Sequence, residues 1–191
     1  QCGWLHPPDS IAPCRGSYKN GPACDPAATR GPAGPYFVGR AGRGLPYSAT
    51  ICERGRPMRV ALVVPPWGPD DIRANDTRGI AGCWPTPGMQ YIAAVLRERG
   101  HEVAYLEGFF HSSDDMRKRV AEFGAQALGV YVISLLWHKA SPFIEAVRRD
   151  NPSLFTFIGG HGATSMPERM LSECPDLDAV VIGEGEATSA R

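Results

Sequence analysis

Residues 59–64 read RVALVV, and this apolar run is the first of five that decide the fold. Later runs of similar length alternate with segments in which apolar residues recur at helical spacing. The predicted strands are Arg59–Val64, Glu102–Leu106, Ala127–Ile133, Leu154–Ile158 and Ala179–Ile182. Three of them are almost wholly apolar, which indicates burial on both faces, as in a parallel sheet covered by helices.

The segments between these strands contain residues that typically begin and end helices. The signals are Ser or Thr as N-cap, proline in the first turn, and glycine or proline after the last turn. They place four helices, which begin after Thr86, Ser113 and Ser141 and at Pro167, and which end at Gly100, Gly124, Pro152 and Leu171. A fifth helix is expected to begin near Ala187, close to the last residue of the chain.

Strict alternation of strands and helices predicts an α/β fold with a flavodoxin-like, doubly wound, five-stranded parallel sheet. Right-handed crossovers favour the strand order 2-1-3-4-5. We expect this domain to span residues 58–191 and to stop within the element that follows the fifth strand.

The first 57 residues differ from the rest in composition. They hold nine Gly and nine Pro, and no periodic run is long enough to make an element. This composition predicts either a disordered leader or a spurious one that precedes a true start at Met58. Seven Lys/Arg against three Asp/Glu give the leader a basic excess, but no basic run or aromatic platform favours nucleic-acid binding.

The six cysteines show no metal-binding spacing. Cys2, Cys14, Cys24 and Cys52 lie in the leader at gaps that match no zinc or iron–sulfur pattern, and Cys83 and Cys174 are single thiols. Single thiols suit a reducing compartment. No stretch approaches the ~20 apolar residues of a membrane span, and the start lacks the apolar segment of a secretory signal. We therefore expect a cytoplasmic protein with no membrane partner.

Ligands of doubly wound sheets bind outside the carboxyl ends of the strands. This rule selects four loops, at residues 65–68, 134–138, 159–162 and 183–186. The last two are rich in glycine, which lets the backbone approach a ligand closely and donate its N–H groups. The candidate site is therefore a crevice at this edge of the sheet.

Three common occupants of this fold fit these loops poorly. A phosphoacceptor domain needs an aspartate at the end of the third strand, where the chain has Ile133-Ser134. A flavodoxin phosphate loop needs free N–H groups after the first strand, where Pro65 and Pro66 offer none. The dinucleotide pattern G-x-G-x-x-G is only half matched, by Gly183-Glu184-Gly185, after the wrong strand.

Four segments in order carry a family resemblance. They are VVPP at 63–66, TPG at 86–88 with YIAAVLRERGHEV at 91–103, IGGHGAT at 158–164, and DAVVIGEGE at 178–186. Over residues 58–188 the chain resembles the N-terminal cobalamin (B12)-binding domain of cobalamin-dependent radical S-adenosylmethionine enzymes.

The resemblance implies a corrinoid over the carboxyl ends of the strands, with its nucleotide tail running down into the sheet. Ser134 would hydrogen-bond the tail, Gly159 and Gly160 would let it pass, and Gly183 to Gly185 would flank the corrin edge. The implied cofactor-binding residues are Pro65, Pro66, Ser134, Leu135, Gly159, Gly160, His161, Gly183, Glu184 and Gly185.

Several of these residues also have plainer interpretations. Pro65 and Pro66 could simply end a strand, and Ser134 could cap a turn. Trp67, Trp84 and Trp137 suit core lids as well as stacking faces for a macrocycle. The glutamates at 184 and 186 suit solvated loops.

The chain lacks the Asp-x-His-x-x-Gly motif that supplies a lower axial histidine in other cobalamin proteins. His138 and His161 are the histidines of the crevice loops, and we predict no metal ligand among the residues of this chain.

The implied function is cobalamin binding as the N-terminal module of a radical S-adenosylmethionine enzyme, with methyl transfer carried out by the full-length parent. No Cys-x-x-x-Cys-x-x-Cys motif is present, so S-adenosylmethionine and a 4Fe–4S cluster belong to a radical core joined in cis, and no catalytic residue is predicted here. Two alternatives stay open: a module for another nucleotide-tailed ligand, such as a flavin or nucleotide sugar, and an interaction domain without a cofactor.

Overall fold

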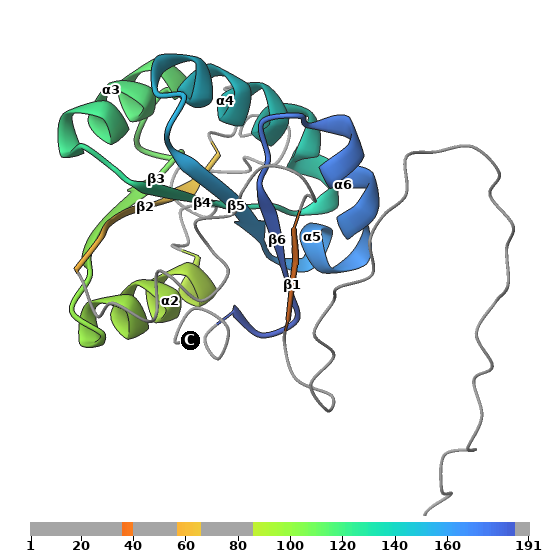
Figure 1. Cartoon of the computed structure of the whole chain (residues 1–191), viewed down its shortest axis with the longest axis horizontal. Helices are drawn as coiled ribbons and strands as arrows, with labels where there is room; N and C mark the ends of the chain where they lie inside the picture. The colour runs from red at the N-terminus through yellow and green to blue at the C-terminus, as the bar shows by residue number, and fades with distance from the viewer. Residues whose placement is uncertain (1–35, 40–56, 66–85, 186–191) are drawn as a thin grey trace, which may run out of the picture.

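A computed structural model describes residues 36–39, 57–65 and 86–185. Its centre is a six-stranded sheet in the order β1-β6-β5-β4-β2-β3 (Figure 1). The strands are β1 (Tyr36–Gly39), β2 (Arg59–Val64), β3 (Glu102–Glu107), β4 (Ala127–Tyr131), β5 (Phe155–Gly159) and β6 (Ala179–Ile182). Strands β2 to β6 pair in parallel. Counted along the chain from β2, their order is 2-1-3-4-5, which confirms the predicted topology.

Strand β1 adds an antiparallel edge to this sheet. Tyr36 pairs with Ile182 and Gly39 pairs with Ala179, so the whole of β1 lies along β6. The expectation that residues 1–57 form no element is therefore wrong for 36–39. A four-residue edge strand is held by backbone pairing and is too short to leave a periodic pattern. Residues 1–35 and 40–56 of the predicted leader lie outside the described part of the chain.

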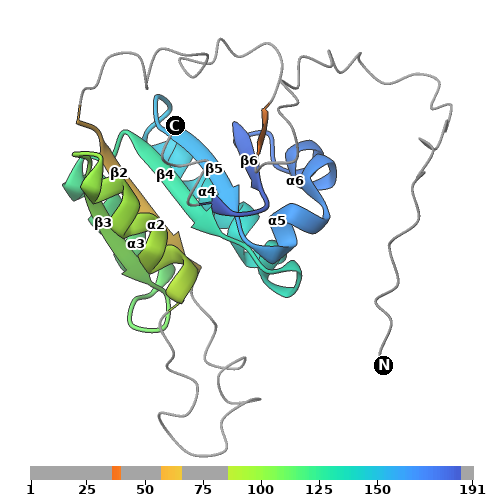
Figure 2. The same cartoon turned by 90° about the horizontal axis from the view of Figure 1, so that it is seen from below.

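Helices cover both faces of the sheet, as Figures 1 and 2 show. The helical elements are α2 (Pro87–Glu98), α3 (Ser113–Phe123), the short 3₁₀ turn η1 (Ser134–Leu136), α4 (Trp137–Asp150), α5 (His161–Ser165) and α6 (Pro167–Glu173). Buried side chains of α2 join one core cluster with β2, and those of α3, α4, α5 and α6 join another on the opposite face. The fifth predicted helix, near Ala187, lies outside the described residues.

The cap predictions hold for α2 and shift by one residue for α3. Thr86 is the N-cap of α2 and Pro87 its first residue. The N-cap of α3 is Ser112, not Ser113, and the Oγ of Ser112 accepts a hydrogen bond from the N–H of Asp115 at 3.2 Å. Gly124 ends α3 in the left-handed conformation, with φ of 63°.

Helix α4 begins earlier than its Ser-Pro signal predicts. It starts at Trp137, which places Pro142 inside the helix. The prediction of a start after Ser141 is therefore wrong. Trp137 and Ala140 are buried on the same face as Ile144 and Val147, so packing of this turn on the core outweighs the hydrogen bond that proline cannot make.

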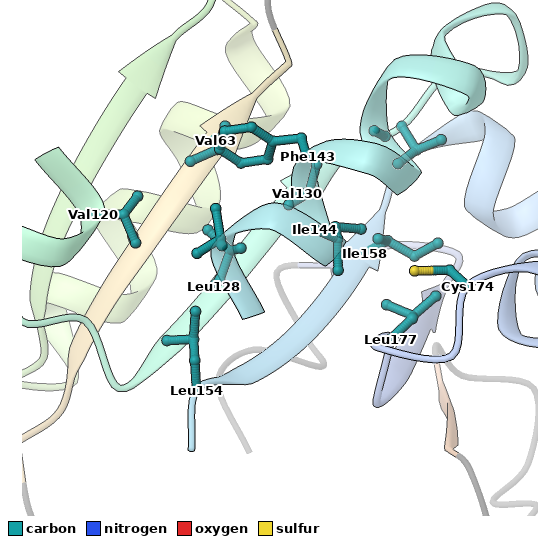
Figure 3. Packing of buried hydrophobic residues seen from close by; sticks show 14 of the residues in the cluster. Val63, Val120, Leu128, Val130, Phe143, Ile144, Leu154, Ile158, Cys174 and Leu177 are labelled. Carbon is teal, nitrogen blue, oxygen red and sulfur yellow. The ribbon is translucent and has the colours of Figure 1, made fainter. Parts of the chain in front are cut away.

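The larger core cluster lies between the sheet and α3, α4, α5 and α6. Figure 3 shows Leu128 and Val130 of β4 and Ile158 of β5 facing Phe143 and Ile144 of α4. The smaller cluster lies under α2. Leu62, Leu128 and Ile158 are each at most 1% exposed, which fits strands buried on both faces.

A buried ion pair joins α4 to the amino end of β6. The Nη1 of Arg148 lies 2.7 Å from the Oδ2 of Asp178, and their side chains are only 13% and 8% exposed. The same Oδ2 accepts a hydrogen bond from the N–H of Thr156 at 2.9 Å. The pair thus connects a helix to two neighbouring strands.

We predict that Asp178→Ala destabilises the fold by about 3–5 kcal/mol, because Arg148 keeps its buried charge and loses its counterion. Urea unfolding of the full chain measures this free energy. The matched control is Asp150→Ala, which removes the better exposed pair of Asp150 with Arg117 and should cost about 0–1 kcal/mol. Equal losses in the two variants would contradict the prediction.

Candidate functional site

A cavity of about 580 Å³ opens on the α2 face of the sheet, toward the carboxyl ends of the strands. Its lining comes from β2, β4, β5 and β6, from the first turns of α2, and from α5 and the loop after β6. The lining residues are Leu62, Thr86, Pro87, Gly88, Met89, Ile92, Gly129, Val130, Tyr131, Phe157, Gly159, Gly160, His161, Thr164, Ser165, Val181, Gly183, Glu184 and Gly185.

The floor of this crevice is one row of side chains across the sheet. Leu62 pairs with Gly129, and Gly129 pairs with Phe157. A Cβ atom at Gly129 would lie 2.5 Å from the Cζ of Phe157 and 2.8 Å from the Cδ2 of Leu62. The side chains of Leu62 and Phe157 therefore close over Gly129, and they form an apolar floor that requires glycine between them.

The next row toward the carboxyl edge contains the open space. Tyr131 of β4 pairs with Gly159 of β5. A Cβ atom at Gly159 would meet only the Cβ of Val181, at 3.7 Å, which is an ordinary contact. The missing side chain at Gly159 thus leaves a trough between Tyr131 and Val181.

Two further glycines hold α5 against the loop that follows β4. Gly160 has a φ of 106°, and a Cβ there would lie 2.7 Å from the carbonyl oxygen of Val132. A Cβ at Gly162 would lie 2.7 Å from the carbonyl carbon of Ile133 and from the backbone N of Ser134. Only glycine permits this approach, so Gly159 provides space whereas Gly160 and Gly162 provide packing.

The rim of the crevice carries its polar groups. The Tyr131 ring packs against Gly160, and its hydroxyl lies 3.5 Å from the Nδ1 of His161. Burial raises the pKa of Tyr131. The N–H of Gly183, whose φ is 78°, donates to the Oγ1 of Thr164 at 3.1 Å and so ties the loop after β6 to α5.

The start of α2 is anchored to β3. The Oε1 of Glu107 accepts hydrogen bonds from the N–H of Thr86, at 2.8 Å, and from the hydroxyl of Tyr105. Burial, and then the neighbouring Glu107 carboxylate, raise the pKa of Tyr105. Because Thr86 lines the crevice, this anchor fixes the position of one wall.

Six of the ten residues implied by the resemblance line this crevice: Gly159, Gly160, His161, Gly183, Glu184 and Gly185. Pro65 is buried at the end of β2, outside the lining. Ser134 and Leu135 are the exposed residues of turn η1, with Leu135 81% exposed, and neither lines the cavity. Pro66 lies outside the described residues. The roles assigned to these ten residues remain predictions.

Of the remaining aromatic and histidine candidates, the structure describes Trp137 and His138, and neither of them lines the crevice. Trp137 is buried, and its Nε1 donates to the Oε2 of Glu173 at 2.7 Å, so its interpretation as a core lid is confirmed. His138 is exposed on α4 and does not line the crevice. Trp67, Trp84, Cys83 and Glu186 lie outside the described residues.

Sequence reasoning missed the inner part of the crevice. Gly129 lies in the middle of an apolar strand, and such a glycine indicates close approach of neighbouring groups. Leu62, Phe157 and Ile92 carry no signal of their own, because they match the apolar pattern of any core residue. Their place in the crevice depends on strand register and on the position of α2.

Within residues 36–39, 57–65 and 86–185, no three His, Cys, Asp or Glu side chains gather closely enough to hold a metal ion. None of the helices in this part of the chain has the length and apolar character needed to cross a membrane. Cys174 is buried, and burial raises the pKa of its thiol.

We predict opposite effects of alanine at the two adjacent glycines. Gly160→Ala should destabilise the fold by about 1–3 kcal/mol, because its positive φ and the Val132 carbonyl oppose a Cβ atom. Gly159→Ala should leave stability unchanged or raise it by up to about 1 kcal/mol, because the unfolded chain loses freedom. Urea unfolding separates the two, and an equal loss at both positions would contradict the geometry described above.

With this geometry in place, comparison with known proteins identifies the class. Residues 77–191 match the B12 binding domain family, and this match covers more than half of the chain. The chain therefore belongs to the B12 binding domain family. The resemblance found in the sequence is confirmed.

Relatives of known sequence are longer than this chain. An uncharacterized methyltransferase of Pyrococcus horikoshii is 31% identical over 133 residues, which cover 69% of this chain and 28% of that protein. An anaerobic magnesium-protoporphyrin IX monomethyl ester cyclase of Rubrivivax gelatinosus is 31% identical over 110 residues, which cover 56% of this chain and 20% of that protein. The chain spans less than a third of either relative.

A solved structure shares the fold. The cobalamin-dependent S-adenosylmethionine radical enzyme OxsB, with aqua-cobalamin bound, matches with a TM-score of 0.54 and 15% sequence identity. The match covers 71% of this chain and 18% of that enzyme. At this identity the likeness supports the fold alone.

Proposed function

We propose that this chain binds cobalamin in the crevice between α2 and the carboxyl halves of β4, β5 and β6. The observation that carries the proposal is the trough at Gly159, where a strand row lacks a side chain between Tyr131 and Val181. An open trough on the sheet face, in a member of the B12 binding domain family, suits a nucleotide tail that runs down from the carboxyl edge.

The proposed contacts follow from this path. Gly159 and Gly160 would line the tail, and Gly183, Glu184 and Gly185 would flank the corrin edge. Pro65, Pro66, Ser134, Leu135 and His161 are proposed contacts of the corrin or of the upper part of the tail. These residues bind and orient the group, and we assign no catalytic role to any of them.

Bound cobalamin would supply a cobalt centre able to carry a methyl group. The chain contributes shape, because its glycine loops and the anchored start of α2 set the width of the crevice. Methyl transfer is proposed for a full-length parent whose radical core, joined in cis, would bind S-adenosylmethionine and a 4Fe–4S cluster.

The direct test is retention of hydroxocobalamin by the full 191-residue chain. After gel filtration, the corrinoid absorbance should co-elute with the protein. Free flavin or nucleotide sugar should not be retained. Elution of the protein without corrinoid would overturn the proposal.

We predict that Gly159→Val weakens cobalamin retention by about 10- to 100-fold, because overpacking the trough costs about 1–3 kcal/mol. Equilibrium dialysis followed by visible absorbance measures the dissociation constant. Valine suits a strand, so circular dichroism and the unfolding midpoint should not fall.

A matched control adds the two methyl carbons of valine at a position outside the crevice. Ala94 is exposed on α2 and does not line the crevice, so Ala94→Val should leave the dissociation constant unchanged. Tight binding by a folded Gly159→Val variant would contradict the proposed tail path.

A further inference from the structure

The crevice divides into two chemical zones. Its buried lining is apolar, with Leu62, Met89 and Val181 each at most 5% exposed and with Ile92 and Phe157 half-buried beside them. The polar side chains of the lining, apart from half-buried Thr86 and Tyr131, are exposed. They are His161, Thr164, Ser165 and Glu184.

The inner zone also lacks free backbone partners. Gly129 pairs with Leu62 on one side and with Phe157 on the other, so β4 and its neighbours form a continuous ladder under the crevice. Backbone N–H and C=O groups paired in a ladder point along the plane of the sheet and not toward a ligand above it.

The two half-buried polar residues have hydrogen-bond partners outside this zone. The Tyr131 hydroxyl lies 3.5 Å from the Nδ1 of His161, at the rim, and its ring covers Gly160. The N–H of Thr86 is occupied by Glu107. A ligand group in the inner zone would therefore meet mainly carbon atoms, from the side chains of Leu62, Met89, Ile92, Phe157 and Val181.

Resting on the proposed function, we infer that this crevice selects corrinoids by the base of their nucleotide tail. It favours a dimethylbenzimidazole, whose two methyl groups form an apolar edge, over a purine. The methyl edge would enter the inner zone, and the imidazole nitrogen on the opposite edge would face the polar rim. Adenine would instead bury an exocyclic amine and ring nitrogens without partners, and unpaired polar groups are costly to bury.

The experiment compares three corrinoids on the full chain: hydroxocobalamin, its analogue with adenine as the lower base, and cobinamide, which has no nucleotide. Equilibrium dialysis followed by visible absorbance gives each dissociation constant. Cobalamin should bind at least about tenfold more tightly than the adenine analogue, and cobinamide should bind more weakly than cobalamin.

The possible results separate the inference from the function on which it rests. Equal affinity for cobalamin and its adenine analogue overturns the selectivity. Equal affinity for cobalamin and cobinamide also overturns it, because the base then contributes nothing, while cobalamin binding itself stands. Retention of none of the three overturns the proposed function.

A pair of variants tests the location of the selectivity. Ile92→Gln places an amide over the inner zone, where it can pair with a purine, and it should reduce the preference for benzimidazole at least about threefold. Val95→Gln is the control, because Val95 is half-buried on the same helix but does not line the crevice. Preferences that stay equal to that of the unmodified chain in both folded variants would contradict the assignment of selectivity to this zone.

Discussion

The close approach of α5 to the loop after β4 is the constraint on which the rest of the site depends. At Gly160 and Gly162 no Cβ atom fits, because backbone atoms of residues 132–134 already lie within 2.7 Å of where it would stand. This contact holds the chain that leaves β5 against the sheet edge. It also places Thr164 where its hydroxyl can accept the N–H of Gly183, so the loops after β5 and β6 are fixed together.

The two sides of the crevice are held by different kinds of interaction. Backbone packing holds the α5 side, whereas a carboxylate holds the α2 side, since Glu107 accepts from both Thr86 and Tyr105. Part of the space between the two sides remains open because Gly159 lacks a side chain, whereas the adjacent row is filled by Leu62 and Phe157. The missing side chain at Gly159 thus deepens a pocket whose walls are held in place on both sides.

Much of the fold could be predicted from the sequence, because each central strand is an apolar run and each crossover is constrained in handedness. The errors come from tertiary packing. Helix α4 begins at Trp137 because the core buries that turn despite Pro142, and α5 forms in a glycine-rich segment that suggests a loop. The glycine loops of the site could be located in the sequence, but Leu62, Phe157 and Ile92 could not, since an apolar residue in a crevice resembles one in a core.

The antiparallel pairing of β1 with β6 has a consequence for synthesis of the chain. The paired residues of the two strands are 140 to 146 positions apart in the sequence, so β1 leaves the ribosome well before β6 has been made. Domains form while translation proceeds from the amino terminus, and contacts between distant segments pay the cost of closing a long loop. Strand β1 therefore stays without its partner until β6 has been made, and it joins the edge of the sheet only after the strands that precede β6 in the chain.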